Sequence, residues 1–177
     1  MWIDLRQEIE RARQALHLSD QVFASLPYTT NWPLLEDKIY HTFCRLQQPT
    51  VRPRWLWEAF RPGAYGLYTD DTPLETLLMF VEVEEVVWLM VNDSADKFWF
   101  YQGKRAAIQA VLNECCYLDE IYLISKKYEW LLCLNHHDVV YGIGSEMSEK
   151  LQRQGGRPVI YRDHALVATP PSSEEGH

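Results

Sequence analysis

Three absences narrow the class of protein to which this chain belongs. No apolar stretch approaches the roughly 18 residues of a membrane-spanning helix, so we expect no membrane partner. The first residues do not combine a basic region with an apolar run, as a secretory signal would, so we expect a cytoplasmic protein. The four cysteines, at positions 44, 115, 116 and 133, contain no Cys-x-x-Cys pair, which favours reduced and mostly buried thiols.

Residues 63–96 contain no basic residue, and this segment accounts for the net negative charge of the chain. The whole chain has 17 basic and 25 acidic residues, a net charge of −8, while residues 63–96 hold eight acidic residues and no basic one. The eight are Asp70, Asp71, Glu75, Glu82, Glu84, Glu85, Asp93 and Asp96. Nucleic-acid binding requires clustered Lys and Arg, so we expect no nucleic-acid partner. An acidic segment instead attracts a basic protein; the alternative is that these carboxylates are solvated loop and edge positions.

The composition that remains is that of a folded domain. The chain has 177 residues, of which 47% are apolar and 13% aromatic. A chain of this size can bury a core without disulfide or metal support. We therefore predict a single α+β domain over residues 1–168, followed by a disordered Pro-, Ser- and Glu-rich tail over residues 169–177.

Helical periodicity dominates the first third of the chain and recurs later. Apolar spacing predicts helices over residues 2–17 and from Trp32 until Pro49, with a short helix between them from about 19 to 25. Further helices are predicted over 73–80, 104–116 and 145–154.

Strand patterns fill the second half. Runs rich in β-branched and aromatic residues predict strands over 85–92, 97–101, 120–125 and 129–134, with a fifth, shorter one at 139–144. Residues 66–68 are compatible with another short strand. The expected fold class is α+β: N-terminal helices, then a mostly antiparallel sheet of four to five strands with one crossover helix, and a C-terminal helix.

The polar sequence Asn135-His136-His137-Asp138 follows the fourth predicted strand. Imidazole and carboxylate groups suit metals, but adjacent histidines on an extended chain point to opposite faces, so one metal rarely takes both. A distant His41, His164 or Cys133 would have to complete the site, and we predict no metal. The alternatives are a strand-end turn whose side chains satisfy backbone groups, or a polar binding or acid–base site.

Two further sets of residues have competing interpretations. Trp55 and Trp57 share a face if extended, and beside Arg52 and Arg54 they could stack on bases or sugars or else pack in the core. The sequence Gly142-Ile143-Gly144-Ser145 is neither a P-loop nor a dinucleotide fingerprint, so no cofactor is predicted.

Residues 87–144 resemble a known but uncharacterised family. The resemblance lies in the strand around Trp88, in Lys97-Phe98-Trp99-Phe100-Tyr101, in the helix containing Ala107-Ile108 and Val111-Leu112, and above all in residues 125–138. This segment is similar to a family of small bacterial proteins known only as a domain of unknown function, which implies no activity or catalytic residue. The chain is also similar in general character to bacterial immunity proteins, which are often small, acidic α+β proteins.

These observations lead to one hypothesis and one alternative. The first is a non-enzymatic, immunity-like protein that binds a basic partner through an acidic face, with Asp70, Asp71, Glu82, Glu84, Trp55 and Trp57 as binding residues. The alternative is a small hydrolase or ligand-binding domain that uses His136, His137 and Asp138. No residue is assigned a catalytic role, and the oligomeric state is left open.

Overall fold

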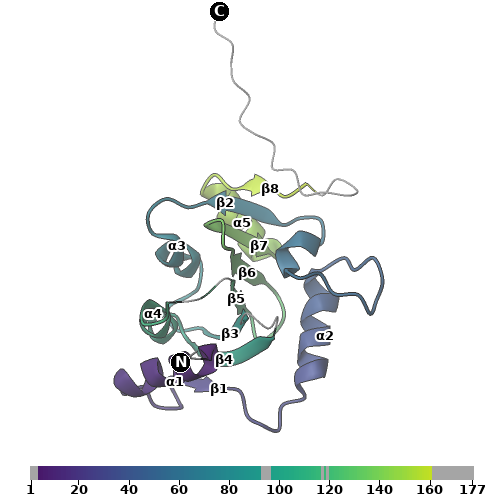
Figure 1. Ribbon diagram of the computed structural model, residues 1–177. Coiled ribbons are helices and arrows are strands. Elements are labelled where there is room, and N and C mark those ends of the chain that lie inside the picture. Colours follow the sequence, from purple (N-terminus) through teal and green to yellow (C-terminus); the bar gives the residue numbers. More distant parts are fainter. Residues whose placement is uncertain (1–3, 93–96, 117, 119, 161–177) are drawn as a thin grey trace, which may run out of the picture.

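One antiparallel sheet organises the molecule. The computed structural model describes residues 4–92, 97–116, 118 and 120–160 (Figure 1). Eight strands pair in the order β1-β4-β3-β5-β6-β7-β2-β8, each antiparallel to its neighbours. The strands are β1 (Phe23–Ser25), β2 (Tyr65–Tyr68), β3 (Val86–Asn92), β4 (Phe98–Lys104), β5 (Ile121–Ile124), β6 (Leu131–Leu134), β7 (Val139–Ile143) and β8 (Arg157–Pro158).

Five α-helices and one 3-10 helix are present in the described part of the chain. They are α1 (Leu5–Ala15), α2 (Trp32–Phe43), the 3-10 helix η1 (Leu56–Ala59), α3 (Pro73–Met79), α4 (Arg105–Asn113) and α5 (Ser145–Arg153). Helix α2 begins at Trp32 because the Asn31 side-chain oxygen accepts the backbone N–H of Leu34 at 3.2 Å. Helix α3 begins with Pro73, whose missing N–H would have no partner at that position.

The sheet is covered on both faces, so the fold has three layers (Figure 1). Because side chains alternate along a strand, Leu132 and Leu134 of β6 pack with α1, α3, α4 and α5 on one face. Leu131 and Cys133 face the opposite core, which α2, η1 and the intervening segment complete. Strands β5 and β6 are buried throughout, as their unbroken apolar sequences predict.

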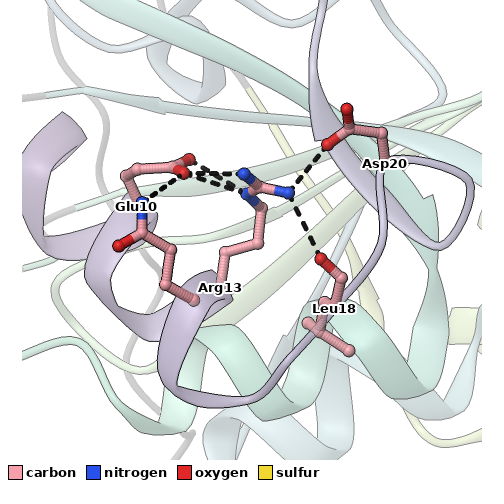
Figure 2. A network of polar contacts seen from close by, with 5 residues as sticks. Glu10, Arg13, Leu18 and Asp20 are labelled. Carbon is pink, nitrogen blue, oxygen red and sulfur yellow. Dashed lines mark hydrogen bonds and ion pairs between the residues drawn. The ribbon is translucent and has the colours of Figure 1, made fainter.

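A guanidinium joins the end of α1 to the segment that leads into β1. Arg13 donates to both carboxylate oxygens of Glu10, to Asp20 at 2.7 Å and to the carbonyl of Leu18 at 3.2 Å (Figure 2). The bond from Arg13 lowers the pKa of the Glu10 carboxyl. This network holds the short strand β1 against the sheet edge formed by β4.

Several sequence expectations were wrong in detail. The short helix predicted near residues 19–25 is instead strand β1, because Phe23–Ser25 pair with Tyr101–Gly103. The predicted four to five strands become eight, since β1, β2 and β8 are short pieces whose partners are remote in sequence. The helices therefore do not all precede the sheet, although α4 does cross over between β4 and β5 as predicted.

Other expectations concern residues outside the part of the chain that the structure describes. The predicted tail at 169–177, Asp93, Asp96 and His164 all lie there. Over the residues that are described, no helix is long and apolar enough to cross a membrane.

Candidate functional site

The connection between β6 and β7 is a tight turn that brings two imidazoles together. The Asn135 side-chain oxygen accepts the backbone N–H groups of His137 at 3.1 Å and Val139 at 3.0 Å, and Asp138 has a positive φ of 56°. The rings of His136 and His137 lie 4.0 Å apart, centroid to centroid. The expectation of histidines on opposite faces was therefore wrong, because the chain turns at this point and is not extended.

A buried carboxylate lies behind the first of these imidazoles. Glu120 has 0% of its surface exposed, and its Oε1 lies 2.7 Å from Nδ1 of His136. Its Oε2 lies 3.5 Å from the Tyr122 hydroxyl and 3.6 Å from the Cys133 thiol. Burial raises the pKa of the Glu120 carboxyl, and the bond from His136 is the largest influence opposing it.

Sheet register explains how Glu120 reaches this position. Ile121 opposes Leu134, so Glu120 stands level with the start of the β6–β7 turn. Glu120 and Tyr122 are two residues apart, so their side chains lie on the same face of the sheet, toward α2 and η1. The sequence analysis missed Glu120; the available signal was one carboxylate directly before the apolar strand Ile121–Ile124.

Aromatic rings cover the turn. Trp57 is 6% exposed and stacks between Trp55 and Tyr141, with ring centroids 5.8 Å and 5.5 Å away and interplanar angles of 14° and 3°. The Trp55 ring lies 4.9 Å from that of His136. Trp55 precedes the 3-10 helix η1 with an extended backbone and stays half-buried, while Trp57 lies within η1 and packs in the core.

Strand β2 adds an exposed tyrosine to this region. The ring of Tyr141 lies over Gly66, where an added Cβ would come within 3.0 Å of it. Tyr68 lies two residues farther along β2, on the same face, and is 68% exposed. We name the five partly or largely exposed rings of this region the corner surface: Trp55, Tyr68, His136, His137 and Tyr141.

The predicted acidic residues separate into two groups. Thr69 donates from its backbone N–H at 3.0 Å and its hydroxyl at 2.8 Å to the carbonyl of Asp138, which places the exposed Asp70 and Asp71 next to the corner surface. Glu82 and Glu84 follow the other end of α3. Glu82 pairs with Lys150 at 3.0 Å and Glu84 pairs with Lys104. The charge of Glu82 and Glu84 is therefore partly compensated within the chain.

The side chains of the corner offer hydrogen-bond donors and acceptors. Burial raises the pKa of the Cys133 thiol well above its ordinary value, so this sulfur is a poor nucleophile. Across the described residues, no group of three or more His, Cys, Asp or Glu side chains is arranged to hold a metal ion. His136 alone combines partial exposure, 32% of its side chain, with direct contact to the buried carboxylate.

The architecture and this site define an α+β domain with an eight-stranded antiparallel sheet and an aromatic–imidazole corner over a buried glutamate. The chain belongs to the family of unknown function DUF6756, whose model matches residues 1–155. No curated protein and no solved structure matches the chain. The resemblance to an uncharacterised domain is thus confirmed, over more of the chain than residues 87–144.

Proposed function

We propose that this protein is a non-enzymatic binding domain that recognises a basic protein through the corner surface and the adjacent Asp70 and Asp71. The observation that supports it is the largely exposed ring of Tyr68, which lies opposite Val139 of β7, just after the histidine turn, and two residues before the exposed Asp70 and Asp71. Protein interfaces concentrate their binding energy in aromatic side chains surrounded by polar groups. Carboxylates at the rim attract a basic partner and accelerate its association.

This proposal changes the acidic face expected from the sequence. Asp70 and Asp71 keep their role because they adjoin the exposed rings. Glu82 and Glu84 already have lysine partners within the chain, so their charge is partly compensated before any partner arrives. Trp57 supports the surface from below and Trp55 contributes to it directly.

The test compares two double variants with the same change in net charge. Asp70→Lys with Asp71→Lys reverses the charge beside the corner surface. Glu114→Lys with Glu129→Lys makes the same change in net charge at exposed positions after α4 and in the β5–β6 turn. A partner isolated from the native cell is titrated against each variant at several salt concentrations. We expect the first variant to slow association by about tenfold and to reduce its salt dependence, as steering by charge predicts. Equal association rates for the two variants would refute the proposal.

A second function, binding of a small ligand with proton exchange, is favoured by the hydrogen bond between Glu120 and His136. A carboxylate that orients an imidazole is the usual arrangement for acid–base chemistry. In a thermal-shift screen of small molecules, a ligand of this kind would stabilise wild type and the Asp70, Asp71 double variant equally. It would fail to stabilise His136→Gln.

A further inference from the structure

We propose that the corner surface takes an arginine side chain of the basic partner, and that His136, held in one tautomer by Glu120, accepts a hydrogen bond from its guanidinium. This inference rests on the proposed function and specifies the group that is recognised. The observations behind it are the 2.7 Å contact between Glu120 and His136, the exposed rings beside it and the carboxylates at the rim.

The buried carboxylate decides which nitrogen of His136 is left to the partner. Oε2 of Glu120 faces two donors, the Tyr122 hydroxyl and the Cys133 thiol, so it is an acceptor. The Tyr122 hydroxyl accepts the backbone N–H of Leu56 at 3.3 Å, which leaves its own hydrogen to donate. With the carboxylate ionised and the imidazole neutral, Nδ1 carries the hydrogen and Nε2 is a bare acceptor.

The groups on and beside the corner surface suit a cation that is both planar and rich in donors. Asp70, Asp71 and Asp138 are exposed carboxylates and present acceptors only. Guanidinium stacks on aromatic rings and donates in its own plane at the same time, whereas the ammonium of lysine cannot do both. Trp55 already stacks on Trp57 and has the guanidinium of Arg54 4.9 Å from its centroid, so the ring offered to a partner's arginine is the largely exposed Tyr68.

Protonation of His136 would reverse the polarity of the site. Nε2 would then donate and carry positive charge, so it would repel a guanidinium. The titratable and charged groups on the surrounding elements are Glu120 and Tyr122 of β5, Cys133 of β6, His137 and Asp138 of the turn, Tyr141 of β7, Tyr68, Asp70 and Asp71 of β2 and its continuation, and Arg54 beside Trp55. Recognition of arginine therefore requires a neutral His136 imidazole, whose Nε2 accepts.

The test uses small probes, because they report on the site without a partner. Nα-acetyl-arginine amide and Nα-acetyl-lysine amide are titrated into the full chain, and NMR follows the indole N–H of Trp55 and the ring C–H signals of both histidines. At about pH 8 we expect saturable shifts with the arginine probe and at least roughly threefold weaker binding of the lysine probe. Absence of saturable shifts, or equal binding of both probes, would overturn the inference.

Two variants test the assignment to His136. His136→Asn places an amide N–H near the position of Nδ1 and so keeps a donor for Glu120, but it lacks Nε2, so its arginine binding should fall at least roughly threefold. His17→Asn is the matched control: His17 is an exposed histidine after α1 with a positive φ of 53°, a conformation that Asn tolerates. This control should behave like wild type. Arginine binding by His136→Asn as strong as that by wild type would overturn the inference.

The same experiments separate this inference from the proposed function. If the Asp70, Asp71 reversal weakens partner binding while the arginine and lysine probes bind equally, the binding surface stands and the arginine assignment fails. If the reversal has no effect on the partner, the proposed function itself fails.

Discussion

Replacement of Glu120 tests whether its buried carboxylate holds the corner together. Glu120→Ala removes a charge-assisted hydrogen bond of about 1.5–3 kcal/mol to His136 and leaves the Tyr122 hydroxyl and Cys133 thiol facing a gap. Adding the cost of the cavity, we expect a loss of about 3 kcal/mol of unfolding free energy near neutral pH. Glu120→Gln keeps the shape and an amide oxygen that accepts from Nδ1 of His136, so it should lie within about 1 kcal/mol of wild type.

The pH dependence of these variants has a definite sign. Burial raises the pKa of Glu120 in the folded state, so the folded chain holds this proton more tightly than the unfolded chain does. The associated stability is complete below the ordinary pKa of a glutamate and is lost as the pH rises through the raised folded value. Glu120→Gln has no such loss. Its stability relative to wild type should therefore increase as the pH rises.

Urea denaturation followed by tryptophan fluorescence measures both effects at about pH 5, 6.5 and 8. The single variant His136→Ala and the double variant Glu120→Ala with His136→Ala complete a cycle that isolates the interaction between the two residues, for which we expect a coupling of about 1–2 kcal/mol. A difference between Glu120→Gln and wild type that stays constant with pH would refute the argument from burial. Equal stabilities of the Ala and Gln variants would show that the bond to His136 contributes nothing.

Two further predictions concern the fold around the site. Gly144→Ala should lower the free energy of unfolding by at least about 2 kcal/mol in the same urea assay. The reason is that Gly144 has a φ of 103° and the added Cβ would meet the carbonyl oxygen of Glu129. An unchanged urea midpoint would contradict this account of the β7–α5 junction. Iodoacetamide at about pH 8 should modify the exposed Cys116 while sparing the buried Cys133 and Cys44. The reason is that burial raises the pKa of Cys44 to about 12 and that of Cys133 well above its ordinary value. Mass spectrometry of peptides locates the label, and rapid labelling of Cys44 in the folded protein would show that its burial is wrong.

The parts of the fold that the sequence predicted well are those with strong local signals. Helix α2 has its Asn31 cap, α3 has Pro73 in its first turn, and β5 and β6 are unbroken apolar runs, so neighbouring residues set their periods and where they begin. The end of α2 was predicted wrongly, because the helix stops at Phe43 and does not continue until Pro49. Strands β1 and β8 have only three and two residues. Segments this short have no period to detect and exist as strands only because a partner edge lies beside them.

In the candidate site, too, some features were predictable from the sequence and others depended on the tertiary structure. The sequence by itself identified the histidine pair, both tryptophans and the location of the surplus carboxylates, since these depend only on which residue types occur where. Tertiary structure alone decided that Glu120 meets His136, 16 positions away, and that lysines far along the chain neutralise Glu82 and Glu84 while Asp70 and Asp71 adjoin exposed rings. The reason is physical: local patterns set the conformation of a segment, whereas burial and charge pairing depend on which distant segments the sheet register brings together.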